Sequence, residues 1–380
     1  MTQRTRPMRT KAWTAVAAPL LLITVAGCDG PSGDWGAGSN YSVQGALAQL
    51  PAAESGGQVL IQTADLDAAS ELSGLERPTD LEVDDLVAWL MPLTGGPSDG
   101  GPAPVFVPLA QVFNPPSIAM HDEFADELGW SLIDTHAFVE RLTPPQSLAV
   151  IAGDFDDSTL DENLPEVDDG VVTVGEGEDF ENDFADVTNA RPLGMPLRLA
   201  QNDHLLAAGA STEEVSSWLS GPDETLADNA HLADVAAALD DVDSVSAVLV
   251  TGGSMALTDA LGAMSAEQVA ALEDRLAPML PEAFQAVGIG WGADGDASII
   301  TLAYAFDSED AAEEAVPLFE ELFANGTSVQ SGQPLSDLLT LDGADRDGDV
   351  VVLTVSVPEG RSPGDAYQML VRADVPFLHR

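Results

Sequence analysis

One segment near the start of the chain, Lys11–Cys28 (KAWTAVAAPLLLITVAGC), decides where the rest of the protein has to fold. Four basic residues lie in the first eleven positions, and an uncharged apolar run follows over residues 12–26. This run is shorter than the ~20 residues that a membrane-spanning helix needs, and Pro19 interrupts it. The pattern predicts a secretion signal over residues 1–27, so we expect the remaining chain to fold after export.

The end of this segment, Val25-Ala26-Gly27-Cys28, resembles the lipobox of bacterial lipoproteins, and the resemblance covers only residues 1–28. It implies that the signal is cut before Cys28 and that the thiol of Cys28 carries a lipid. Two or more acyl chains would hold the protein on the extracytoplasmic face of the cell membrane. The alternative is an ordinary signal peptide with a cysteine near its end by chance.

Cysteine content limits how the exported chain can be stabilised. Cys28 is the only cysteine in 380 residues, so no disulfide can form within the chain. The mature protein must therefore depend on its hydrophobic core, and it is long enough to form one large domain or two of ordinary size.

The charge of the chain excludes one class of partner. All 64 acidic residues follow Cys28, where they face nine arginines and no lysine, which gives the mature chain a formal charge of −55. Nucleic-acid binding depends on lysine and arginine at phosphates, so a nucleic-acid partner is not expected. The acidity is typical of a solvated surface, or of a protein that binds cations or a cationic partner.

The acidic residues are densest over residues 154–186, where 14 of 33 positions are Asp or Glu and none is basic. Calcium needs six to eight oxygen ligands, so this stretch keeps open the alternative of a calcium-responsive surface module. The order of ligands that an EF-hand requires is absent, and no metal-ligating residue is predicted.

The body follows a segment that is rich in Gly, Ser and Asp, and residues 28–42 are predicted to form a flexible tether. Apolar strands then end at acidic or hydroxyl residues that can cap a helix, at Asp65, Asp154 and Ser308. Residues 105–112 have strand-like spacing, whereas residues 134–142 have helical spacing, with Phe138, Val139 and Leu142 on one face.

Further along the chain, residues 197–201 and 204–208 predict a hairpin, and capping boxes at 211–214 and 265–268 predict helices. Strands and helices mix without regular alternation, which favours an α+β fold with mainly antiparallel, hairpin-paired sheets and peripheral helices. We expect two lobes, residues 43–195 and 196–380, and the alternative is a single continuous sheet.

A catalytic site is weakly supported. Ser254 lies in Thr-Gly-Gly-Ser-Met-Ala after an apolar strand, an arrangement that resembles the nucleophile elbow of serine hydrolases. Ala256 replaces the last glycine of that motif, and the only histidine downstream is His379, so a helix cap is the simpler interpretation of Ser254. His121 and His136 are 15 positions apart without a metal-binding motif.

These observations predict a non-enzymatic envelope lipoprotein of the binding or scaffold type, with an envelope protein or a wall polymer as its partner. Cys28 is the only site residue predicted, as the position of lipidation, and no catalytic residue and no cofactor is expected. A serine hydrolase that uses Ser254 stays open as a less favoured alternative.

Overall fold

The computed structural model describes residues 35–36, 40–53, 57–96, 101–113, 120–251, 255–260, 266–295 and 297–380. Its centre is one twelve-stranded sheet in the order β11-β12-β10-β9-β8-β1-β2-β3-β7-β6-β5-β4. The strands are β1 (Leu60–Asp65), β2 (Thr135–Thr143), β3 (Gln146–Gly153), β4 (Glu166–Asp168), β5 (Val171–Val174), β6 (Leu197–Asn202), β7 (Leu205–Gly209), β8 (Ser246–Thr251), β9 (Ala286–Asp294), β10 (Ala297–Ala305), β11 (Thr340–Asp347) and β12 (Val350–Ser356).

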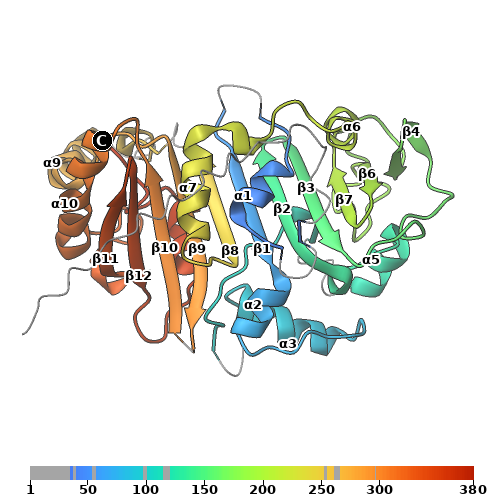
Figure 1. Cartoon of the computed structure of the whole chain (residues 1–380), viewed down its shortest axis with the longest axis horizontal. Helices are drawn as coiled ribbons and strands as arrows, with labels where there is room; N and C mark the ends of the chain where they lie inside the picture. The colour runs from blue at the N-terminus through green and yellow to red at the C-terminus, as the bar shows by residue number, and fades with distance from the viewer. Residues whose placement is uncertain are drawn as a thin grey trace, which may run out of the picture.

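Helices cover both faces of this sheet (Figure 1). One face packs against α1, α6 and α7, and the other packs against helices that include α2, α3, α10 and α11. Because both faces are buried, the central strands are apolar on both sides. The helices are α1 (Val43–Ala48), α2 (Leu66–Leu72), α3 (Val83–Leu93), α5 (His121–Leu128), α6 (Thr212–Ser220), α7 (Ala230–Asp240), α8 (Leu257–Ala260), α9 (Ala266–Leu276), α10 (Glu309–Asn325) and α11 (Asp365–Val371).

The predicted α+β class is confirmed. Every pair of neighbouring strands is antiparallel, and consecutive strands form hairpins at β2–β3, β6–β7, β9–β10 and β11–β12. The hairpin predicted around Asn202-Asp203 is among them, as β6 and β7. Asp203 has a φ of 52°, a left-handed conformation that tight turns require and that Asp tolerates better than most residues.

The strand order contains an internal repeat. The sequence β1-β2-β3-β7-β6 in one half matches β8-β9-β10-β12-β11 in the other, and the halves join where β1 pairs with β8. The sheet is thus continuous from β11 to β4. The boundary predicted at 195/196 lies between β5 and β6, which pair with each other, and the division into two lobes stays a prediction.

Two elements predicted from local spacing are wrong. Residues 134–142 are not a helix but mostly strand β2, in which Phe138 and Val139 are both buried on opposite faces of the sheet. A strand buried on both sides has the same apolar composition as a buried helix, so spacing alone does not separate them. Residues 105–112 do not pair as a strand; they form a strap that ends in a 3-10 turn, Gln111–Phe113.

The predicted helix caps are confirmed at two of the three strand exits. Asp65 accepts a hydrogen bond from the backbone N–H of Ala68 (2.9 Å) in α2, and Ser308 accepts one from Ala311 (3.3 Å) in α10. Asp154 follows β3 but precedes no helix, so the cap predicted there is wrong. Its carboxylate instead lies 3.1 Å from Nε2 of His136.

Part of the predicted tether packs on the body. Trp35 is only 3% exposed and joins the core beneath α1, where its indole N–H donates to the carbonyl of Ser42 (3.4 Å). Gly36 has a φ of 73°, and a Cβ placed on it would lie 2.5 Å from the Cβ of Ala152 in β3. The composition of this segment predicted a free tether, because composition alone does not show whether a single aromatic side chain packs into the core. The rest of the tether, residues 28–34 and 37–39, lies outside the described residues.

Within the described ranges, none of the helices has both the length and the apolar character that crossing a membrane requires. The signal segment and Cys28 lie outside these ranges, so their assignment stays a prediction.

We expect Trp35→Ala to lower the free energy of unfolding by about 3 kcal/mol, because it removes a large buried side chain and leaves a cavity. Urea denaturation followed by circular dichroism measures this change. Phe184→Ala is the matched control, because Phe184 is 74% exposed and its removal should change stability by less than ~0.5 kcal/mol. Equal stability of both variants would show that Trp35 does not anchor the segment.

Candidate functional site

A cavity of about 830 Å³ lies on the face of the sheet opposite α1, α6 and α7. Strands of the first half form its floor, the strap before Phe113 and the loop over residues 190–196 form its walls, and α3 and α11 close it. Its lining is mostly apolar and includes Met91, Phe106, Val107, Leu109, Val112, Phe113, Ala149, Leu193, Met195, Leu197 and Ala208, with the polar residues Gln62, Thr94, Gln111, Glu140, Ser147, Arg191, Tyr367 and Gln368.

A comparison of the two halves of the sheet explains why the cavity forms in the first half, which contains β1, β2, β3, β7 and β6. One row of paired residues crosses the floor in register, and its members are Gln62, Glu140, Ala149, Ala208 and Leu199. The equivalent row in the other half consists of Ser246, Trp291, Ile300, Val355 and Leu341. Where that half has a tryptophan, an isoleucine and a valine, the first half has a carboxylic acid and two alanines. The small side chains leave the space that the larger ones fill.

The wall over residues 190–196 is anchored by the ion pairs of Arg191, a buried arginine. Arg191 is about 5% exposed, and its Nε donates to Glu127 of α5 (2.9 Å) while its Nη2 donates to Asp186 (3.0 Å). Thr188 of the same loop donates from its hydroxyl to Glu127 (3.0 Å). Charge-assisted hydrogen bonds of this kind are among the stronger ones in proteins, so they hold the loop, which contributes Leu193 to the cavity lining, against α5.

A polar group with unusual surroundings lies on the floor of the cavity. Glu140 is 1% exposed, and the backbone N–H of Gln111 in the strap donates to both of its oxygens (3.0 Å each). The side-chain Nε2 of Gln62 donates to the carboxyl group of Glu140 (3.4 Å). The hydroxyl of Tyr367 donates to Oε1 of the same Gln62 side chain (3.2 Å). Strand, strap and α11 therefore meet at one carboxyl group.

Burial raises the pKa of Glu140 to about 8, against an ordinary value of 4.5, and the two donors oppose this only in part. At neutral pH the neutral acid is the dominant form. The sequence carries a signal that could have identified this residue. Once residues 135–143 are recognised as a strand, Glu140 is a carboxylate that lies between Phe138 and Leu142 on one face of that strand.

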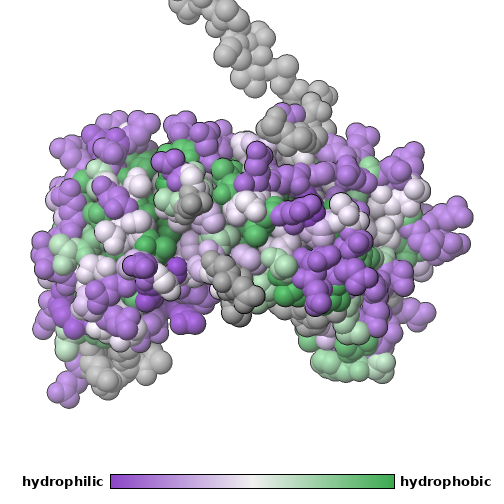
Figure 2. All heavy atoms as spheres, turned by 90° about the horizontal axis from the view of Figure 1, so that it is seen from below, coloured by the Kyte–Doolittle hydropathy of each residue, from purple (hydrophilic) through white to green (hydrophobic). Residues whose placement is uncertain are grey.

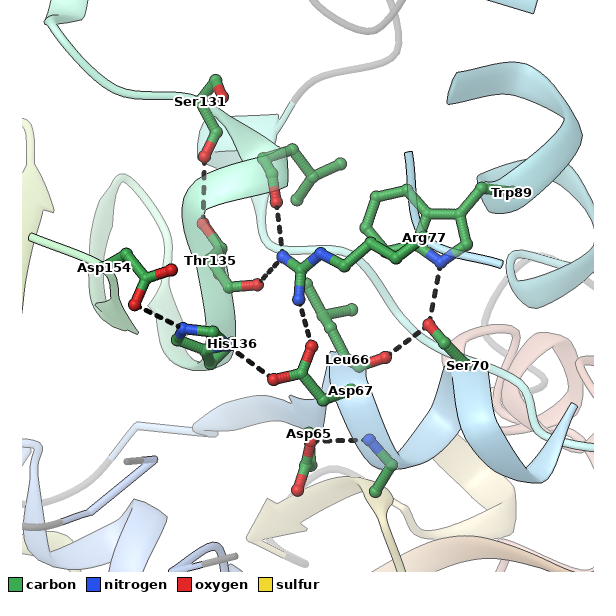
Figure 3. A network of polar contacts seen from close by, with 12 residues as sticks. Asp65, Leu66, Asp67, Ser70, Arg77, Trp89, Ser131, Thr135, His136 and Asp154 are labelled. Atoms are coloured by element: carbon green, nitrogen blue, oxygen red, sulfur yellow. Dashed lines mark hydrogen bonds and ion pairs between the residues drawn. The ribbon is translucent and has the colours of Figure 1, made fainter. Parts of the chain in front are cut away.

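Acidic residues that follow two of the predicted strands come close together around His136 (Figure 3). Nδ1 of His136 lies 2.5 Å from Asp67, which follows Asp65 at the start of α2, and Nε2 contacts Asp154. Arg77 also pairs with Asp67, and its guanidinium lies 5.1 Å from the centre of the Trp89 ring. The hydrogen bonds and charges of Asp154 and Asp67 raise the pKa of His136 despite its partial burial. This network ties α2 to β2 and β3.

The other predicted positions have structural roles or lie outside the described residues. His121 is buried and accepts a hydrogen bond from the backbone N–H of Leu132 (3.2 Å). Within the described residues, neither His121 nor His136 belongs to a group of three or more side chains that could hold a metal ion. His379 lies beside Ala256. The backbone N–H of His379 donates to the carbonyl of Met255 (3.0 Å). Ser254 and Cys28 are not among the described residues.

The acidic stretch 154–186 partly neutralises buried arginines. Asp179 pairs with Arg198 (2.8 Å) and also accepts from the backbone N–H of Thr212 at the start of α6 (2.7 Å). Asp186 pairs with Arg191, as described above. Among the residues that the structure describes, no group of three or more His, Cys, Asp or Glu side chains is arranged to hold a metal ion.

Comparisons with known proteins add little. No family model matches the chain, and no curated protein matches it. Crystal forms I and III of a protein named TP0453 are similar, with TM-scores of 0.32 and 0.33 and sequence identities of 9% and 11%. The alignments cover 82% of this chain and 92% and 93% of the TP0453 chain. TM-scores of this size are too low to support an inference about function.

We expect stability to fall as pH rises from about 4.5 to about 8, because over this range folded Glu140 keeps a proton that the unfolded chain releases. The full effect is on the order of 5 kcal/mol for a shift of this size. Glu140→Gln removes the titrating group and should flatten the dependence, measured as urea unfolding midpoints from pH 5 to pH 8.

The control for this measurement is Glu320→Gln on the exposed side of α10, which should keep the wild-type dependence on pH. If Glu140→Gln and the wild-type protein lose stability in parallel, Glu140 does not hold the extra proton.

Proposed function

We propose that this protein is an exported lipoprotein, anchored to the extracytoplasmic face of the cell membrane through Cys28, whose body binds a largely apolar small molecule. The observation that carries the binding role is the cavity of about 830 Å³ with its apolar lining and a few convergent polar groups on its floor. Small-molecule sites in proteins commonly have volumes of ~300–1,000 Å³ and this kind of lining.

The architecture of the cavity supports a stable site. Its floor is a continuous hydrogen-bonded sheet, and its wall at residues 190–196 is fixed by the buried pair of Arg191 and Glu127. A site whose walls are already ordered loses little conformational entropy of its own when a ligand binds. The alanines of the floor make fewer apolar contacts than larger side chains would, so they stabilise the core less.

The groups at the floor favour binding over reaction. An amide, a phenol and a neutral carboxyl group at Gln62, Tyr367 and Glu140 are bonded to one another or to the strap, and such groups orient a ligand through hydrogen bonds. We therefore propose a non-enzymatic role. A neighbouring envelope protein or a wall polymer remains a proposed partner for the acidic exterior, and nucleic acid does not, because the charge of −55 repels it.

Apolar side chains are exposed on the surface, and one of them also lines the cavity. Seen from below, the outline of the molecule is concave between its two ends, and apolar residues are exposed at the tip of one of them (Figure 2). Leu193, which lines the cavity, is about half exposed, and Val187 and Phe184 of the same loop are more exposed still. Exposed apolar side chains beside a cavity are typical of ligand-binding surfaces.

The binding role predicts opposite changes in affinity and stability when the cavity is filled. Ala149→Ile together with Ala208→Val gives the floor the residues found at the equivalent positions of the other half. We expect the melting temperature to stay or rise, because a cavity is filled, and the affinity for a fluorescent apolar probe such as 1-anilinonaphthalene-8-sulfonate or a neutral analogue to fall at least tenfold.

Ala238→Ile is the matched control, since α7 covers the opposite face of the sheet and the substitution adds a side chain of the same size. It should leave probe affinity unchanged. If the double variant binds the probe as well as the wild-type protein does, the cavity is not the binding site.

The anchoring role predicts that Cys28→Ala releases the protein from membranes. Loss of the thiol removes the only atom in the chain to which a thioether-linked lipid can attach. Fractionation of the native host's cells and labelling with radioactive palmitate measure this, and the label should disappear. Ser32→Ala is the control, and continued labelling of Cys28→Ala would contradict the proposed anchor.

A further inference from the structure

The loop that walls the cavity carries a group of exposed apolar side chains. Phe184 is 74% exposed, Val187 52% and Leu193 48%, all within ten positions of the chain. Among the described residues, no other stretch of ten carries more than two exposed large apolar side chains. Single exposed apolar side chains are normal on a protein surface, whereas a group of them marks an interaction surface.

The fold of the loop brings these side chains together. The carbonyl oxygen of Asp183 lies 1.8 Å from the position that a Cβ on Gly194 would occupy. Gly194 has a φ of 67°, a conformation that favours glycine, and the close approach leaves no room for a side chain. The backbone beside Phe184 therefore contacts the backbone beside Leu193, and Val187 lies in the turn between them. We call these three side chains the apolar patch.

Helix α5 holds the loop in one conformation. Arg191 donates to Glu127 (2.9 Å), and the hydroxyl of Thr188 donates to the same carboxylate (3.0 Å). The side-chain amide of Asn189 donates to Glu123, one turn earlier in α5. The apolar patch is thus presented by an ordered loop. A partner that binds it meets a surface that is already in place, which reduces the entropy lost on association.

Negative charge precedes the apolar patch along the chain. Residues 176–186 include six acidic residues and no basic one. Two of the six are neutralised, since Asp179 pairs with Arg198 and Asp186 pairs with Arg191. The remaining four are exposed, and the ion pairs in the described part of the chain do not involve them: Glu176, Glu178, Glu181 and Asp183. An exposed aromatic side chain thus follows directly on a segment of uncompensated carboxylates.

We propose that the apolar patch and residues 176–183 form the docking surface for an envelope protein whose contact surface is an apolar hollow bordered by lysine or arginine. Aromatic side chains dominate the centres of protein interfaces, and opposite charges at the rim favour association. A membrane surface with anionic lipids would repel the same carboxylates. This inference rests on the proposed function, in which an envelope protein is a partner. Because Leu193 also lines the cavity, the docked protein would lie beside the bound ligand.

Three synthetic peptides test the chemistry of this surface. The first is a short amphipathic helix of leucine and lysine, the second has the same composition in an order without an apolar face, and the third has glutamate in place of lysine. Isothermal titration calorimetry measures their affinities for the full chain with Cys28→Ala. We expect the first peptide to bind at least tenfold more tightly than the others. Its affinity should fall as NaCl rises from about 50 mM to about 300 mM, because salt screens the charges.

Substitutions in the apolar patch locate the binding. Phe184→Ser with Val187→Ser should weaken the first peptide at least tenfold and leave the melting temperature unchanged, since both side chains are exposed. Val242→Ser with Val371→Ser is the matched control, because these exposed valines lie on other elements. It should retain the wild-type affinity within about twofold.

Substitutions of the carboxylates test the charge. Glu178→Gln with Glu181→Gln removes two negative charges and should weaken the first peptide about threefold, with a smaller dependence on salt. Glu314→Gln with Glu320→Gln removes the same charge from the exposed side of α10 and should leave the affinity unchanged.

The outcomes separate this inference from the proposed function. If the three peptides bind equally, or if the patch variant binds as the wild-type protein does, the docking surface is overturned. Liposomes of phosphatidylcholine and phosphatidylglycerol that bind the protein through Phe184 would also overturn it, in favour of a membrane contact.

The cavity is tested on the same samples. Ala149→Ile with Ala208→Val should leave peptide affinity unchanged; if it abolishes peptide binding, the peptide occupies the cavity and the docking surface is wrong, while a binding cavity remains. If the fluorescent apolar probe fails to bind but peptide affinity still depends on Phe184, the proposed ligand of the cavity fails and the docking surface stands.

Discussion

The antiparallel pairing of β1 with β8 holds the two halves of this protein together. Leu60 pairs with Val250 and Ala64 with Ser246, so a hydrogen-bonded ladder runs through the middle of the molecule. A strand edge left open at this point would expose unpaired backbone groups on both halves. With the ladder formed, twelve strands act as one support, and each helix layer packs on a surface that both halves share.

The two halves use one strand order for different purposes. In the second half, Trp291, Ile300 and Val355 fill the layer between the sheet and the helices, and this half is a conventional core. In the first half, Ala149 and Ala208 leave that layer open. Interiors elsewhere in proteins are close-packed, so the open layer is a feature of the fold that a ligand can exploit.

The cavity also depends on segments without regular structure. The strap before Phe113 is held to the floor by the bond from Gln111 to Glu140, and the loop after residue 190 is held to α5 by Arg191. Both attachments join residues that are far apart in the sequence. In a chain with no possible disulfide, buried hydrogen bonds and ion pairs such as these fix the loops.

Local signals in the sequence predicted local structure well. The caps at Asp65 and Ser308, the bond from the Glu214 N–H to the Ser211 side chain and the hairpin at Asn202-Asp203 all depend on neighbouring residues, and all are present. The strand at residues 135–143 was mistaken for a helix because burial on both faces erases the alternation that identifies a strand. Glu140 was missed for the same reason, since its meaning depends on which face of a strand it occupies.

The acidic character of the protein, its lack of disulfides, its α+β class and most of its turns and caps could be predicted, because composition and neighbouring residues are sufficient for these properties. The position of Trp35 in the core, of His136 between Asp67 and Asp154, and of Gln62, Glu140 and Tyr367 together on the floor of a cavity is visible only in the folded protein. These outcomes depend on strand register and on long-range packing, and neither is encoded in the spacing of nearby residues.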